Sequence, residues 1–328
     1  MSTATRIDRA APSLATLEDA LNATEDRLRR ALDHVRDAVQ QRSASGTGGA
    51  DDFQLQIYDL AFLRAGLSAA GAMLRWARDQ ERGADAELAA AMAGLYTAEA
   101  VGEVRARLGV RAVDYGTTRE ALEAPFIGLL DGALQQAASV AALEALGALL
   151  CDRGGDPGPV DLPEDKRMMA DTFRRFADEV VAPRAERIHR EDLMIPDAII
   201  DGVRDLGCFG LSVPERFGGL LPDDGEDSLG MIVATEELSR ASLGAAGSLI
   251  TRPEIMARAL LAGGTEEQKA AWLPRIAAGD PLVAISVTEP DTGSDVAAVA
   301  LKATRTDGGW RLNGAKTWCT FAGKAGVI

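Results

Sequence analysis

The sequence predicts a mainly α-helical protein whose last part begins an antiparallel β domain. Apolar residues recur at helical spacing up to Ala277. After Pro281, short segments of alternating apolar and polar residues replace this pattern, and dipeptides that favour tight turns lie between them. Between two groups of helices, residues 152–163 hold three Gly and three Pro, a composition that continues neither a helix nor a central strand. We therefore expect a helical extension over residues 1–151, a linker over 152–163, a second helical domain over 164–280 and the first part of a β domain over 281–328.

Four helical patterns make up the extension. The first has apolar or small residues at alternating steps of four and three, a heptad-like stripe that needs a partner to pack against. This stripe consists of Leu17, Leu21, Thr24, Leu28, Ala31, Val35 and Ala38. After a Gly/Ser-rich break at residues 43–49, the others are a helix through Leu60, Leu63, Leu67 and Leu74, one over 84–108 and one over 118–150. We expect these helices to form a bundle.

Five more helical patterns follow the linker, each bounded by Gly or Pro. They span residues 164–189, 196–206, 228–240, 244–261 and 266–277. Before the last of them, Thr265 and Gln268 form a capping box, with a hydroxyl at the N-cap and an amide three residues later. These patterns predict the second helical domain.

The final segment carries the signals of β structure. Leu282–Val287 is an apolar run of strand length, and Asp307-Gly308 and Asn313-Gly314 are dipeptides that favour tight hairpin turns. We expect strands over Leu282–Val287, Trp310–Leu312 and Lys316–Thr320.

The last four residues, Ala325–Ile328, have the composition of a further strand, but so few strands do not close a stable sheet. We expect the chain to be the N-terminal portion of a longer protein. The alternative is a small terminal sheet with an unpaired edge.

Composition excludes several function classes. With Lys+Arg 35 and Asp+Glu 50 the net charge is −15, which repels nucleic acid and anionic membrane surfaces. Hydrophobic content of 47% and charged content of 26% exclude wholesale disorder. No uninterrupted run of apolar residues is long enough to span a membrane, so we expect no membrane span.

The three cysteines, Cys151, Cys208 and Cys319, lie far apart and form no CxxC pair. Their spacing predicts neither a disulfide framework nor a metal site. Because the N-terminus also lacks an apolar core of secretory length, we expect reduced thiols in a cytoplasmic protein.

A constellation of hydroxyls and a glycine directly follows the first expected strand. Thr288-Glu-Pro-Asp-Thr-Gly-Ser-Asp295 combines side-chain hydroxyl groups around a proline-shaped turn with a glycine that permits close backbone approach. Such a turn can cradle an oxygen-rich ligand, or it can be an ordinary turn capped by Asp295. It lacks the lysine of a P-loop and the spacing of a dinucleotide GxGxxG, which excludes both mechanisms.

Trp318 and Thr320 form the second feature. In a strand they would share one face, about 7 Å apart, while Cys319 would point to the other. An indole plane beside a hydroxyl donor suits a flat heteroaromatic ring. The alternative is a tryptophan in a sheet core with a threonine beside it.

Together, Thr288-Glu-Pro-x-x-Gly-Ser-Asp295 and Asn313-Gly-x-Lys-x-Trp-x-Thr320 resemble the paired signature of the acyl-CoA dehydrogenase family. The resemblance covers residues 164–328, with Val213-Pro-Glu-Arg-Phe-Gly-Gly219 in a matching loop, and leaves the extension outside the common pattern. It implies the N-terminal helical domain of that family followed by the beginning of its middle β-barrel domain.

The resemblance implies FAD as the cofactor and no metal. Six residues would contact FAD: Val287 and Thr288 at the flavin ring, Gly293 and Ser294 at the diphosphate, Trp318 beside the isoalloxazine, and Thr320 near N5. Ser294 would also touch the CoA part of an acyl-CoA substrate.

The implied reaction is α,β-dehydrogenation of an acyl-CoA thioester by a homodimer or homotetramer, which passes electrons to an electron-transferring flavoprotein. In this family the catalytic glutamate lies in a C-terminal domain, so we expect the base beyond Ile328 and nominate none here. We expect Glu289 to be a structural turn residue, and Glu236 and Glu237 to be helix-face charges or ion-pair partners.

With its long helical extension, the chain resembles those members of the family that act on a short branched or dicarboxylic acyl-CoA, and the resemblance implies a substrate of this class. A substrate carboxylate requires a cation, and Arg252 lies on the helix that borders the acyl pocket in this family. The alternative is a solvent-facing or helix-terminal arginine. Two other functions stay open, namely a dehydrogenase for another short branched acyl-CoA and a non-catalytic assembly module built from the helical parts.

Overall fold

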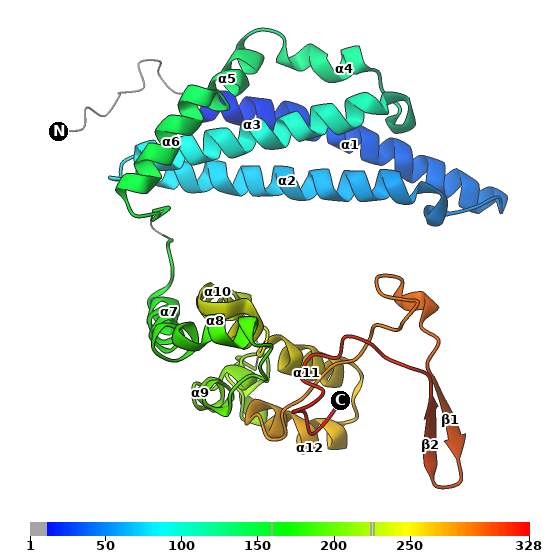
Figure 1. The fold of residues 1–328 in the computed structure, drawn as a ribbon. Coiled ribbons are helices and arrows are strands. Elements are labelled where there is room, and N and C mark those ends of the chain that lie inside the picture. Colours follow the sequence, from blue (N-terminus) through cyan, green and yellow to red (C-terminus); the bar gives the residue numbers. More distant parts are fainter. Residues whose placement is uncertain (1–11, 159, 224, 226) are drawn as a thin grey trace. The chain divides into compact units, whose positions relative to one another are not determined.

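The computed structural model describes residues 12–158, 160–223, 225 and 227–328. The chain divides into two compact units between Val160 and Asp161 (Figure 1). Each unit has its own hydrophobic core, and each is described by itself below.

Three long helices lie alongside one another in the first unit (Figure 1). They are α1 (Leu14–Ser45), α2 (Gln54–Asp79) and α3 (Ala86–Val110). The hydroxyl of Ser13 caps α1 by accepting the N–H of Thr16. The heptad-like stripe predicted for α1 is confirmed, since its members from Leu17 to Val35 are buried in the bundle core.

The helix predicted over residues 118–150 is broken into three. These are α4 (Arg119–Glu123), α5 (Leu129–Ala137) and α6 (Val140–Asp152). Pro125, which lacks an N–H donor, lies in a 3₁₀ turn after α4, and Gly128 adopts a left-handed φ of 98° before α5. The apolar pattern alone did not reveal these interruptions.

α2 is unusually apolar. Among the described helices, Ala50–Asp79 is the one that is long and apolar enough to cross a membrane, and α5 with α6 passes the same test as a bent pair. This finding weakens the sequence-based exclusion of a membrane span, which considered only uninterrupted apolar runs. Length and composition are weak evidence, however, because the core helix of a soluble bundle passes the same test, and Leu60, Leu63 and Leu67 of α2 are buried in the bundle core.

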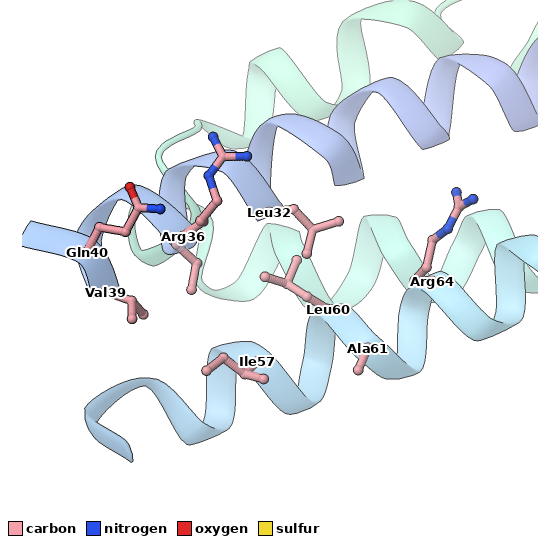
Figure 2. Close-up of a pocket in the computed structure, with 9 residues that line it drawn as sticks. Leu32, Arg36, Val39, Gln40, Ile57, Leu60, Ala61 and Arg64 are labelled. Carbon is pink, nitrogen blue, oxygen red and sulfur yellow. The ribbon is translucent and has the colours of Figure 1, made fainter. Parts of the chain in front are cut away.

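An apolar groove of about 520 Å³ lies between α1 and α2. Figure 2 shows Leu32 and Leu60 pointing into the space between the two helices. At the rim, Arg36 and Arg64 are each paired with a carboxylate of α1, so neither arginine offers an unpaired charge to a ligand.

The second unit contains six helices among its described residues (Figure 1). They are α7 (Glu164–Phe176), α8 (Ala182–Arg190), α9 (Asp197–Asp205), α10 (Ser228–Ser242), α11 (Thr251–Gly263) and α12 (Glu266–Ala277). A π-helical turn at Ala177–Val181 joins α7 to α8, and a second one at Leu243–Gly247 follows α10. The capping box of Thr265 and Gln268 at the start of α12 is confirmed.

A single described hairpin represents the β structure. β1 (Lys302–Thr306) and β2 (Gly309–Asn313) pair antiparallel around the predicted Asp307-Gly308 turn, and the hairpin stands away from the helices of its unit (Figure 1). The prediction of strands over Leu282–Val287 and Lys316–Thr320 is wrong. The first forms one isolated bridge instead of a ladder, and the second is interrupted by a left-handed residue.

The Leu282–Val287 segment is nevertheless anchored, as its apolar composition indicates. Leu282 packs in a core cluster with Leu249 and Ile250, and Val283 packs in a neighbouring cluster with Ala257. Burial of these side chains therefore fixes the backbone that leads into Thr288 beside α11.

Candidate functional site

The two sequence motifs meet in the second unit. The backbone N–H of Thr317 donates to the carbonyl of Thr288 at 2.9 Å. The ammonium of Lys316 donates to the carbonyl of Val287 at 2.7 Å and to Oε1 of Glu289 at 2.8 Å. We call residues 287–293 together with residues 316–320 the motif junction.

Glu289 holds the motif junction together. Its carboxylate is buried and also accepts the backbone N–H groups of Ala300 at 2.7 Å and Leu301 at 2.9 Å. Lys316 and then these two N–H donors stabilise the charged form, which lowers the pKa of Glu289 to about 2. Its backbone closes a tight turn with Thr292, so Glu289 is a structural turn residue as predicted.

We expect Glu289→Gln to remove a pH-dependent part of the stability. Because folding lowers the pKa of Glu289 from 4.5 to about 2, the carboxylate stabilises the fold fully above pH 4.5, and this contribution is lost as the pH falls towards 2. The unfolding free energies of wild type and variant should therefore converge over this range. Denaturant titrations at several pH values measure the difference in unfolding free energy. The control is Glu236→Gln, because Glu236 is exposed. A constant difference at every pH would contradict the prediction.

The residues predicted to contact a cofactor lie at or beside the motif junction with differing exposure. Val287, Gly293 and Ser294 are exposed. A Cβ added to Gly293 would come no closer than 4.0 Å to Thr288, so the space beside this glycine is open. Two buried hydroxyl oxygens, in Ser286 and Thr317, have no described hydrogen-bond partner.

Trp318 departs from the predicted geometry. Its φ is 57° and its side chain is 88% exposed. The alternation of a strand therefore does not relate Trp318 to Thr320, and the alternative of a tryptophan in a sheet core is also wrong. What the structure offers instead is an indole that projects from a turn with its surface accessible.

Arg252 lies in the first turn of α11 and reaches the motif junction. Its Nη2 donates to Oγ1 of Thr320 at 2.9 Å, and its Nη1 donates to Oγ1 of Thr251 at 2.7 Å. The side chain is half-buried, so it is helix-terminal but not solvent-facing. Both partners are neutral hydroxyls, which leave the guanidinium charge without compensation at these contacts.

Glu237 behaves as the predicted ion-pair partner. It is buried on α10 and pairs with Arg174 at 2.5 Å and Arg240 at 3.3 Å, while Glu236 is exposed. Burial alone would raise the pKa of Glu237, but the two guanidinium groups outweigh it and the pKa is lowered. Among the described residues, no group of His, Cys, Asp and Glu is arranged to hold a metal ion.

Sequence reasoning missed the role of Lys316. It stood in the second motif as one fixed residue without an assigned contact, and its main partner lies 27 residues earlier. The only signal was its presence beside Trp318 in the signature. The contact between Arg252 and Thr320, 68 residues apart, had no sequence signal.

Comparison with known proteins assigns the motif junction to a family. Residues 163–280 match the family model described as acyl-CoA dehydrogenase, N-terminal domain, and residues 284–328 match the middle domain. Residues 163–328 belong to the acyl-CoA dehydrogenase family. The fold class predicted from the sequence is confirmed by these matches and by the helical structure.

Two relatives of acyl-CoA dehydrogenase type differ in how much of the chain they match. (2S)-Methylsuccinyl-CoA dehydrogenase of Cereibacter sphaeroides is 34% identical over 320 residues, which are 96% of this chain and 58% of that protein. Benzylmalonyl-CoA dehydrogenase of Aromatoleum aromaticum is 36% identical over 163 residues, 49% of this chain and 42% of that protein. The chain therefore spans little more than half the length of the first relative, and the match to that relative includes the helical extension.

Among solved structures, a glutaryl-coenzyme A dehydrogenase in complex with glutaryl-CoA is similar. It shares 28% sequence identity with a TM-score of 0.46, over 52% of this chain and 43% of the other. A glutaryl-CoA dehydrogenase from Mycobacterium smegmatis in complex with FADH2 shares 32% identity with a TM-score of 0.45, over 50% of this chain and 41% of the other.

Proposed function

We propose that this chain is the FAD- and acyl-CoA-contacting part of a dehydrogenase that converts (2S)-methylsuccinyl-CoA to mesaconyl-CoA. The observation that carries the proposal is the motif junction, where Lys316 ties two signature segments of the acyl-CoA dehydrogenase family into one site beside Arg252. The family assignment supports the reaction class, and the relative that also matches the extension supports the substrate.

The residues of the motif junction fit FAD chemically. The exposed indole of Trp318 offers a flat surface for an isoalloxazine ring. The open space at Gly293 permits close approach of a diphosphate, with the exposed Ser294 beside it. Val287 and Thr288 would contact the ring from the other segment. When bound, FAD would take up the β-hydrogen of the acyl group as a hydride.

Thr320 is prepared to act as a hydrogen-bond donor. Its oxygen already accepts a hydrogen bond from Arg252, which leaves the hydroxyl hydrogen for another partner. A donor fixed in this way would face a ring nitrogen without reorganising during the reaction. We therefore assign Thr320 the contact near N5.

We assign no general base within this chain. Glu289 is a buried carboxylate of the motif junction, but Lys316 and two backbone N–H groups hold it in its charged form with a pKa of about 2. A base of such low pKa is poorly matched to removal of a proton next to a thioester. The base of the whole protein is proposed to lie outside residues 1–328.

Arg252 supports a substrate with a free carboxylate. Its half-buried guanidinium is held by two neutral hydroxyls at the motif junction and retains donors for an anion. We infer that Arg252 binds the carboxylate of the methylsuccinyl group. A short branched acyl-CoA without a free carboxylate would offer no anion for this guanidinium to bind.

The test of the reaction uses the whole protein. It should purify with flavin absorbance or acquire it on addition of FAD, and a panel of acyl-CoA thioesters with an artificial electron acceptor should give the highest kcat/KM for methylsuccinyl-CoA. A protein that binds no flavin would instead favour an assembly module. We propose that the natural acceptor is an electron-transferring flavoprotein and that the protein is a cytoplasmic homo-oligomer.

Arg252→Ala should raise KM for methylsuccinyl-CoA about 20-fold, because a charge-assisted hydrogen bond contributes roughly 1.5–3 kcal/mol. The KM for butyryl-CoA, which has no second carboxylate, should change far less. Steady-state kinetics with both substrates measures the difference, and Arg258→Ala, an exposed arginine of the same helix, is the control. Equal changes for both substrates would remove the proposed carboxylate contact.

A further inference from the structure

A series of directed hydrogen bonds runs from the start of α11 to the motif junction. The hydroxyl of Thr251 donates to the carbonyl of Ser248 at 2.9 Å, and its oxygen accepts Nη1 of Arg252 at 2.7 Å. Nη2 of Arg252 donates to the hydroxyl oxygen of Thr320 at 2.9 Å. A hydroxyl group has one hydrogen, so Thr251 can only accept where it meets Arg252, and each bond has a fixed direction. We call Thr251, Arg252 and Thr320 the α11 network.

Arg252 differs from other arginines of its unit in what it contacts. Arg258 of the same helix pairs with Glu254 at 3.1 Å, and Arg240 pairs with Asp178 at 2.6 Å. The side-chain partners of Arg252 are two threonine hydroxyls, and its guanidinium is half-buried. Neutral hydroxyls compensate a partly buried cation poorly, so these contacts do little for stability. What they do fix is the orientation of the groups involved.

The backbone around Thr320 is a turn and not a strand. Trp318 and Phe321, on either side of it, have left-handed φ values of 57° and 67°, which residues other than glycine rarely adopt. Such a turn persists only where its surroundings hold it. Phe321 packs against the core cluster that contains Ile250, and Arg252 holds Thr320 itself. The position of Thr320 therefore depends on side-chain contacts rather than on a ladder of backbone hydrogen bonds.

We propose that Thr251 and Arg252 are positioning residues for the hydroxyl of Thr320, which they orient towards the flavin. This inference rests on the proposed function, from which it takes the contact of Thr320 near N5 but not the choice of acyl group. Arg252 occupies one lone pair of the Thr320 oxygen, which turns the hydroxyl hydrogen away from α11. Donation by a cation also polarises this hydroxyl and strengthens it as a donor.

Thr251 acts one step further from the flavin. Because Nη1 is bound to Thr251, the guanidinium cannot turn without breaking that contact, and Nη2 stays on Thr320. Valine has nearly the same shape as threonine but accepts no hydrogen bond. With valine at this position the guanidinium could turn, and the direction of the Thr320 hydroxyl would no longer be fixed. The effect of Thr251 should be smaller than that of Arg252, through which it acts.

A double-mutant cycle on the affinity for FAD tests the inference in the whole protein. Titration of the apoprotein with FAD, followed by flavin fluorescence, gives the dissociation constants. Arg252→Met and Thr320→Val should each weaken FAD binding about tenfold, the size expected for one lost hydrogen bond. The double variant should also bind about tenfold more weakly, and not about 100-fold as for independent residues, because Arg252 acts through Thr320.

Conservative variants separate positioning from charge. Thr251→Val should weaken FAD binding about threefold, and Thr251→Ser, which keeps the hydroxyl, should bind FAD as wild type does. Arg252→Lys keeps the charge and a donor and should restore part of the affinity. Arg258→Met, at an exposed arginine of the same helix, is the matched control and should leave the affinity unchanged.

The absorbance spectrum of the bound flavin provides a second readout, because it responds to hydrogen bonds at the ring. Arg252→Met and Thr251→Val should shift the visible bands in the same direction as Thr320→Val. The double variant Arg252→Met/Thr320→Val should have the spectrum of Thr320→Val. Circular dichroism establishes that the variants are folded, and if Arg252→Met does not fold, Thr251→Val takes its place in the cycle.

Three results would overturn the inference. The first is a cycle in which the two effects multiply to about 100-fold, which would mean that Arg252 acts on FAD through its charge. The second is an Arg252→Met variant with the affinity and spectrum of wild type. Both would leave the proposed function intact. The third is a whole protein that binds no FAD, which would overturn the proposed function as well.

Discussion

Replacing Lys316 with methionine in the whole protein is expected to weaken FAD binding by up to about 100-fold, because the loss of charge-assisted hydrogen bonds that position the cofactor contacts costs roughly 1.5–3 kcal/mol. The ammonium is the described side chain that joins the carbonyl of Val287 to the carboxylate of Glu289. Methionine has a similar length but donates no hydrogen bond, so the two segments of the motif junction would lose their common tie. Titration of the apoprotein with FAD, followed by flavin fluorescence, measures the affinity.

Lys324→Met is the matched control for this prediction. Lys324 follows the motif junction and pairs with the exposed Asp197, so its loss should leave FAD affinity unchanged. Lys316→Arg, which keeps the charge and the donors, should restore part of the affinity. If Lys316→Met bound FAD as tightly as wild type, Lys316 would not position the cofactor contacts.

Replacing Asp59 with alanine is expected to destabilise the helical extension by about 3 kcal/mol, the cost of breaking a buried charge pair whose partners are partly exposed. Asp59 is buried on α2 and accepts hydrogen bonds from Tyr115 at 2.8 Å, Arg107 at 3.1 Å and Arg111 at 3.3 Å. Its loss would leave the buried Tyr115 hydroxyl without an acceptor and two arginines without their shared carboxylate. Denaturant unfolding followed by circular dichroism measures the change.

Tyr115→Phe separates the two contributions. It removes the hydroxyl but keeps the ring and the ion pairs, so it should cost about 1 kcal/mol. Burial and then the hydrogen bond to Asp59 raise the pKa of Tyr115, which indicates that its hydroxyl stays protonated as a donor. An Asp59→Ala variant as stable as wild type would show that the network contributes nothing to the bundle.

Local sequence signals predicted most of the helices. The stripe from Leu17 to Val35 is buried along α1, and the capping box at Thr265 starts α12, because both depend on residues only three or four positions apart. The Asp307-Gly308 turn and the hairpin around it were predicted for the same reason. The apolar periodicity over residues 118–150 predicted one helix, but Pro125 within this range interrupts it. Here the helix-breaking residue outweighed the periodicity.

The strand assignments failed where pairing was needed. A strand forms only if another segment supplies its hydrogen bonds, and Leu282–Val287 has a single bridge. The expected geometry of Trp318 relied on a strand that does not form, and its positive φ points the indole in a direction that alternation did not predict. The residue types named for the site were unaffected, because the motif rather than the strand identified them.

By itself, the sequence determined the helical character of the protein, the boundary region between its units and the two motifs that assign residues 163–328 to a family, since each is written in neighbouring residues. Tertiary structure alone decided that Lys316 ties Glu289 to Val287 and that Arg252 contacts Thr320. These contacts join residues 27 to 68 positions apart, and their formation depends on how the buried clusters bring the chain back on itself, which no local pattern records.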